Sequence, residues 1–183
     1  MKKISTLGIV AAIVTAISLV GAQWVTASVP GPAYLAVSSF SAVSQNANLA
    51  KLSVTTGADI PRKSDSFISS NPVVGFAWAD LGAGKAFLTT IHPVIGRDSN
   101  QNPNAWHAHT ATLAGGATAP HDFCVASIDT TPTAGIQIHG STMDVNVQKS
   151  KLPFALADFD VAVGFTVQGD GACASGLAVQ IST

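Results

Sequence analysis

Strict alternation of apolar residues near the C-terminus is the feature that most restricts how this chain can fold. Phe159, Val161, Val163, Phe165 and Val167 alternate with small or polar residues. Successive side chains of a β-strand point to opposite faces, so this period of two is typical of a strand with one face buried. The same period recurs in the last residues of the chain, after a glycine-containing turn. The pattern therefore predicts a β-sheet protein.

The charged residues support the same fold class. They make up 10% of the chain, against about 25% in a typical soluble domain. All ten acidic residues are Asp, and Glu does not occur. Glu favours helices, whereas Asp favours turns and helix caps. With a net charge of −1, this composition argues against a helical bundle, a coiled coil and a nucleic-acid-binding protein.

The N-terminus has the pattern of an export signal. Two lysines precede an apolar run over residues 7–22, and small residues suit cleavage after Ala22 or after Ala27. We therefore expect residues 1–27 to be a signal peptide in a helix. The alternative is an uncleaved anchor, because this segment is just long enough to span a bilayer at about 20 residues. Either interpretation places the rest of the chain outside the cytoplasm, secreted or at the cell surface.

The remainder divides into two parts by composition. Residues 28–70 are rich in Ser, Ala, Thr and Asn, and we expect an N-terminal arm or spacer with at most one strand joining the main fold. Residues 71–183 contain seven or eight short β patterns with no amphipathic helix between them. They predict an antiparallel β-sandwich of immunoglobulin-like or related Greek-key topology. An eight-stranded β-barrel is the alternative.

A change of parity predicts one particular turn. The apolar residues Ile136 and Ile138 fall on even positions, whereas Met143, Val145 and Val147 fall on odd ones. Since the faces of a strand repeat every two residues, a turn or bulge must lie between the two groups, at residues 139–141.

Two cysteines, Cys124 and Cys173, follow the export segment. An isolated pair in an oxidising compartment most often forms one disulfide. It would close a loop of about 50 residues. Both cysteines fall on predicted strands, so we expect the bond to join two sheets.

The clearest chemical lead is the sequence Trp-His-Ala-His at residues 106–109. On a strand, His107 and His109 share a face, with their bases about 6–7 Å apart, so both rings can chelate one ion. The third ligand is expected to be His92, if the strands that end at His92 and begin at Ala105 are antiparallel neighbours. Neutral imidazoles suit Zn or Cu. The alternative is a solvated or partly buried strand face that binds no metal.

The other polar groups give weaker patterns. His121 is expected about 13 Å along the strand from His109, and His139 cannot be placed. Asp158 and Asp160 share a strand face but are better explained as exposed charges that discourage edge pairing. The polar loop at 98–102 resembles the opening of a calcium-binding loop, although Asx turns explain its composition better. Motifs for nucleophilic catalysis are missing from the sequence.

The sequence thus favours a non-enzymatic structural or interaction module outside the cytoplasm. A Zn- or Cu-binding protein that uses His92, His107 and His109 is the second hypothesis. The third is a surface-filament subunit whose arm donates a strand to a neighbouring copy. A polybasic patch is lacking, so we expect neither nucleic acid as a partner nor a membrane beyond the N-terminal segment.

Overall fold

The computed structural model describes residues 31–63, 73–92 and 105–183. These residues form ten β-strands and two short 3-10 turns. None of the described segments is a helix with the length and apolar character needed to cross a bilayer. The expected signal peptide and the polar loop at 98–102 lie outside the described residues. The strands are β1 (Val37–Ser44), β2 (Leu49–Thr56), β3 (Val73–Asp80), β4 (Lys85–Ile91), β5 (His107–Ala114), β6 (Phe123–Thr130), β7 (Gly135–His139), β8 (Thr142–Gln148), β9 (Val161–Gly169) and β10 (Leu177–Ser182).

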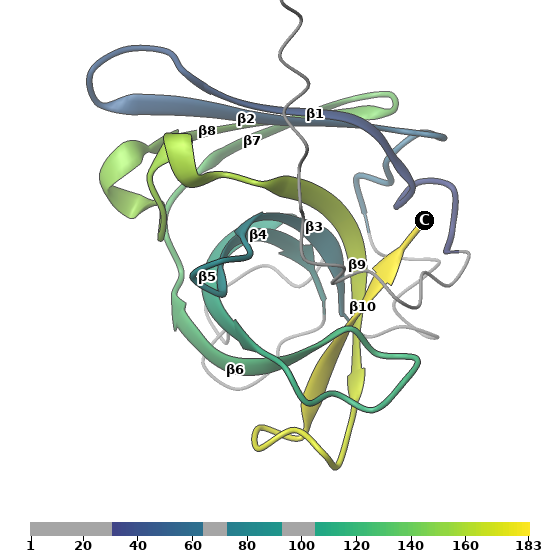
Figure 1. Cartoon of the computed structure of the whole chain (residues 1–183). Coiled ribbons are helices and arrows are strands. Elements are labelled where there is room, and N and C mark those ends of the chain that lie inside the picture. Colours follow the sequence, from purple (N-terminus) through teal and green to yellow (C-terminus); the bar gives the residue numbers. More distant parts are fainter. Residues whose placement is uncertain (1–30, 64–72, 93–104) are drawn as a thin grey trace, which may run out of the picture.

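Six strands close into a barrel in the order β10-β6-β5-β4-β3-β9, and each neighbouring pair is antiparallel (Figure 1). The seam between β10 and β6 is short, with Ala178 opposite Cys124 and Val179 opposite Phe123. The disulfide between Cys124 and Cys173 lies beside this seam and ties β6 to the turn between β9 and β10. The expected pair is therefore joined, but it links parts of the barrel rather than two sheets.

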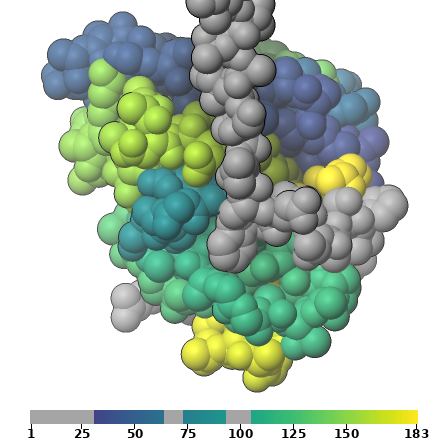
Figure 2. All heavy atoms as spheres, viewed as in Figure 1, coloured from purple at the N-terminus to yellow at the C-terminus, as the bar shows by residue number. Residues whose placement is uncertain are grey.

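The other four strands form an antiparallel sheet in the order β1-β2-β8-β7. This sheet lies across the outside of the barrel as a second layer (Figures 1 and 2). One face of β2 and one face of β8 are buried against the barrel, because apolar residues alternate along both strands. The buried residues are Ala50, Leu52 and Val54 on β2, and Met143, Val145 and Val147 on β8.

Strand β3 belongs to both layers of the core. Its residues Phe76 and Trp78 pack against the four-stranded sheet, whereas Ala77 and Ala79 face the barrel interior. Both faces are therefore buried, and every residue from Val74 to Ala79 is buried. The four-stranded sheet thus covers one side of the barrel.

The structure confirms an all-β antiparallel fold. Eight of the ten described strands, β3 to β10, lie within residues 71–183, where seven or eight were expected, and the other two precede them. The two sheets stack face to face as in a sandwich, and the larger sheet closes on itself as in a barrel. The turn expected from the parity change is confirmed, because β7 ends at His139, β8 begins at Thr142 and Gly140 between them has φ of +59°.

Two segments differ from their expected environment. Strands β1 and β2 lie within the segment interpreted as an arm, yet they pair with each other and β2 pairs with β8. The strand at 161–169 is also more than half-buried, because Ala162 and Gly164 face the second layer. A Cβ added at Gly164 would lie 2.0 Å from the carbonyl oxygen of Leu35, so this close approach requires glycine.

Candidate metal centre

Three histidines from two neighbouring strands meet at one end of the barrel. His107 and His109 lie on β5 and point to the same side, as the period of two requires. In the pairing of β4 with β5, Thr90 lies opposite His107 and Leu88 lies opposite His109. His92 directly follows β4, so continuing this register places it opposite Ala105, as expected, and on the face of the two β5 histidines.

The three rings are close enough to share one ion. One nitrogen from each ring can be chosen so that all three lie within 4.8 Å of one another. The ring centroids lie 4.6 Å apart for His92 and His107, 4.8 Å for His107 and His109, and 5.8 Å for His92 and His109. All three side chains are buried, with exposures of 4%, 9% and 4% for His92, His107 and His109. The three histidines therefore do not lie on a solvated strand face.

Hydrogen bonds orient the ring of His107. Its Nδ1 lies 3.0 Å from the carbonyl oxygen of Ala105, and its Nε2 lies 2.9 Å from Nε2 of His92. A carbonyl can only accept, so Nδ1 of His107 donates its proton there. In the neutral ring, Nε2 of His107 then carries the lone pair and accepts a hydrogen bond from Nε2 of His92. The nitrogen with the lone pair is the one that can bind a metal.

This arrangement has the outer hydrogen bond found in most histidine metal sites. Ligating histidines usually donate their second ring N–H to a carbonyl or carboxylate, which fixes the tautomer and the ring orientation. The bond from His107 to Ala105 supplies that contact. Ligand nitrogens around a tetrahedral zinc lie about 3.3 Å apart, given Zn–N bonds of about 2.0–2.1 Å. For both Nε2 atoms to bind the ion, the proton on Nε2 of His92 must move to Nδ1 of the same ring, and the two Nε2 atoms, 2.9 Å apart, need to separate by only a few tenths of an ångström.

The donor set determines the chemistry available. Three histidines and no carboxylate form the group, so a divalent ion held here would keep its double positive charge. Structural zinc sites have four protein ligands, whereas catalytic sites have three and leave one position open. Three imidazoles thus provide a centre with an open position that an anion or a water molecule can occupy. Zinc and copper both accept this set.

The other two histidines lie elsewhere. His139 is exposed at the end of β7. Nδ1 of His121 lies 2.9 Å from Oδ2 of Asp170, close to the disulfide rather than to the three-histidine group. The pKa of Asp170 is held far below its usual value, first by the backbone N–H of Ala172, and then by His121 and the backbone N–H of Thr118. His121 therefore serves to anchor a loop.

Asp158 and Asp160 have no catalytic arrangement in the structure. Asp158 lies in a 3-10 turn, and Oδ2 of Asp160 accepts a hydrogen bond from the backbone N–H of Leu81 at 2.8 Å. Both residues are exposed. The contact to Leu81 ties the start of β9 to the turn after β3.

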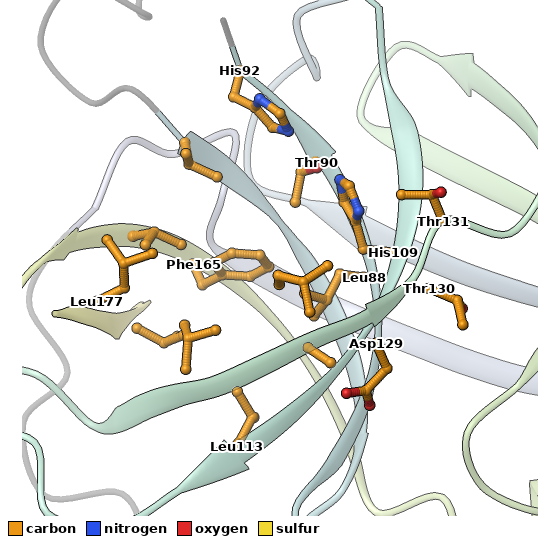
Figure 3. Close-up of a pocket in the computed structure, with 16 residues that line it drawn as sticks. Leu88, Thr90, His92, His109, Leu113, Asp129, Thr130, Thr131, Phe165 and Leu177 are labelled. Atoms are coloured by element: carbon orange, nitrogen blue, oxygen red, sulfur yellow. The ribbon is translucent and has the colours of Figure 1, made fainter. Parts of the chain in front are cut away.

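Sequence reasoning missed the surroundings of the histidines. His92 and His109 form part of the wall of a cavity inside the barrel, together with Thr90 (Figure 3). The residues that line this cavity come from all six barrel strands, and Ala111 is the alanine among them. They become informative only once the barrel is known to close, because closure makes them neighbours.

No family model matches the chain, and neither a curated protein nor a solved structure resembles it significantly.

Proposed function

We propose that this protein binds one zinc or copper ion outside the cytoplasm, with His92, His107 and His109 as ligands. The convergence of three buried imidazoles, with donor nitrogens within 4.8 Å of one another, carries the proposal. The hydrogen bond from His107 to Ala105 supports it, because it fixes the tautomer of the neutral ring that has its lone pair on Nε2.

The proposed location rests on two observations. Cys124 and Cys173 are joined in a disulfide, a bond that persists mainly in oxidising compartments. The N-terminal sequence has the pattern of a signal peptide. Export fits a protein that acquires its metal outside the cell or in the periplasm.

Metal titration of the exported protein tests the proposal. We expect the chelator-treated protein to bind one equivalent of Zn²⁺ or Cu²⁺ in calorimetry, and mass spectrometry of the native protein to show one bound ion. Replacing one ligand, as in His109→Gln, should weaken binding by more than tenfold, since even the loss of an outer hydrogen bond costs 10–100-fold. A d–d absorption spectrum of the cobalt-loaded protein should report nitrogen ligands in a site of low coordination number.

His139→Gln is the matched control, because it removes an exposed histidine outside the group. It should leave both the stoichiometry and the affinity unchanged. Less than stoichiometric metal after loading, or equal binding by a variant that lacks all three ligands, would overturn the proposal. The structural or interaction module and the filament subunit stay predictions, and a failed titration would leave them as the working hypotheses.

A further inference from the structure

The barrel contains a cavity of about 520 Å³. This volume lies within the range of about 300–1,000 Å³ that is common for small-molecule sites. An engineered apolar cavity of about 150 Å³ already admits benzene. The cavity therefore has room for a molecule considerably larger than benzene.

A small side chain and irregular pairing on one strand leave room for the cavity. Ala111 on β5 is the alanine in its wall. The pairing of β5 with β6 shifts between Thr110 and Ala111 and again between Thr112 and Leu113. Such bulges bend a strand and are frequent next to binding sites. Both bulges fall on the wall of the cavity.

Most of the wall is apolar. Phe165 and Leu88 lie at its centre in Figure 3. Apolar walls of this kind bind the hydrocarbon part of a ligand through area burial. The remaining apolar lining residues are Val73, Ala111, Leu113, Val125, Ile128, Val167, Leu177 and Val179.

One side of the cavity is polar and includes the buried hydroxyl group of Thr90. Thr90 lies between Leu88 and His92 on the same face of the chain and is 3% exposed. Its Oγ1 has no hydrogen-bond partner among the residues that the structure describes. Thr130 and Asp129, also in the wall, are already hydrogen-bonded to Thr110 and to Ser127 respectively. Because buried hydroxyls are normally satisfied, Thr90 indicates where a polar group of a ligand binds.

The metal centre borders the same side. His92 and His109 form part of the cavity wall, so an ion held by the three histidines lies at this wall. Its fourth position is then reached from the cavity. A doubly charged ion with three neutral ligands in an apolar environment favours an anion at that position, since an uncompensated buried charge is costly.

We propose that the cavity binds a monocarboxylate with an apolar body, such as a medium-chain fatty acid. Its carboxylate occupies the open position of the metal and accepts a hydrogen bond from Thr90 Oγ1. Its hydrocarbon part lies along Phe165 and Leu88. This proposal deepens the proposed metal-binding function and rests on it.

Binding of octanoate and of 1-octanol to the exported full chain tests the proposal, with both probes below the concentration at which octanoate forms micelles. We expect zinc-loaded protein to bind octanoate at least tenfold more tightly than metal-free protein. Octanol has no carboxylate, so its affinity should be the same with and without zinc. Acetate should bind at least tenfold more weakly than octanoate, because it has no apolar body.

Three variants separate the parts of the site. Thr90→Val removes the hydroxyl group at similar volume and should weaken octanoate several-fold in zinc-loaded protein while leaving zinc binding unchanged. Ala111→Leu fills the cavity and should weaken both probes at least fivefold. Ala126→Leu makes the same change on an exposed position of β6 outside the cavity and should have no effect.

The outcomes distinguish the two proposals. A protein that binds no zinc overturns the proposed function and this inference together. Stoichiometric zinc with equal octanoate affinity in the loaded and metal-free forms overturns this inference alone. Unchanged octanoate binding in Thr90→Val likewise contradicts the assigned position of the carboxylate, even if Ala111→Leu fails to fold.

Discussion

The two faces of strands β3 and β4 are packed in opposite ways. The outer face carries the large side chains Phe76, Trp78 and Phe87, which are fully buried against the four-stranded sheet. On the inner face, Ala77 and Ala86 pack in a second cluster, whereas Val73, Leu88 and Thr90 line a cavity. The same two strands therefore build a filled core on one side and a hollow on the other.

The outer face therefore contributes stability, whereas the inner face provides the space and the polar groups for binding. A close-packed interior tolerates few voids, and an empty volume inside a protein forfeits attractive contacts. The outer core offsets that loss, because large aromatic side chains contribute the most burial per residue. The inner face can then carry polar groups: Thr90 lies on β4 and His92 directly follows it, and His109 lies beside them on β5. We infer that the second sheet allows the barrel to remain hollow.

The largest expected effect comes from truncating the outer core. Trp78→Ala should lower the free energy of unfolding by about 3–5 kcal/mol, since the fully buried ring leaves a void that its neighbours cannot fill. Leu88→Ala on the inner face should cost about 2 kcal/mol, at the low end for such changes, because Leu88 already borders a cavity.

Urea unfolding followed by circular dichroism measures both values. A cost for Leu88→Ala equal to or above that for Trp78→Ala would show that the inner face, too, is closely packed. The comparison between the two faces would then be wrong.

Two alanines on β5 allow a sharper version of the same comparison. Ala108 packs in the outer core and Ala111 faces the cavity, and both are at least 95% buried. Ala108→Leu should destabilise the protein by about 1–3 kcal/mol through overpacking. Ala111→Leu should change the free energy of unfolding by less than about 1 kcal/mol, because the new side chain enters existing space.

Thermal unfolding of the two variants beside the unchanged protein provides the measurement. Equal destabilisation would mean that the cavity does not accept a larger side chain. In that case the loss of octanoate binding in Ala111→Leu would also need to be reassigned to misfolding.

Local patterns predicted most of the strands and the three-histidine group. Alternation and turn residues identified the hairpin from β3 to β4 and the turn at Gly140. The three histidines could be brought together from sequence because only one register, between the strands that bear them, had to be assumed. Such short-range relations depend on the period of a strand and the length of a loop, both of which are visible in a sequence.

Long-range relations were not visible. The barrel closes through two residue pairs between β6 and β10, with nothing in either strand to indicate that partner. The serine-rich strand β1 has only a weak apolar pattern, because it lies at the edge of its sheet and has a largely exposed surface. The cavity depends on the summed volume of side chains from all six barrel strands, which no single pattern contains.

The smallest expected effect on stability comes from the loop contacts beside the disulfide, outside both the outer core and the cavity wall. The carboxylate of Asp170 accepts hydrogen bonds from the backbone N–H groups of Ala172 and Thr118 and from Nδ1 of His121. These contacts hold its pKa in the folded protein far below the usual value. The unfolded chain therefore binds more protons below about pH 4, where an unperturbed Asp titrates. The stability that Asp170 contributes is complete above that pH and is lost as the pH falls toward its folded pKa.

Asp170→Asn should therefore be less stable than the unchanged protein at pH 7, and the difference should narrow as the pH is lowered from 4 to 2. Urea unfolding at pH 7, 4 and 2 measures the difference, with the exposed Asp158→Asn as the control for loss of a charge. A difference that stays constant with pH would show that the ionised carboxylate is not what holds this loop.

Because these contacts lie outside the outer core and the cavity wall, Asp170→Asn should leave zinc and octanoate binding unchanged. A loss of either ligand would mean that the barrel end stapled by the disulfide is coupled to the metal centre.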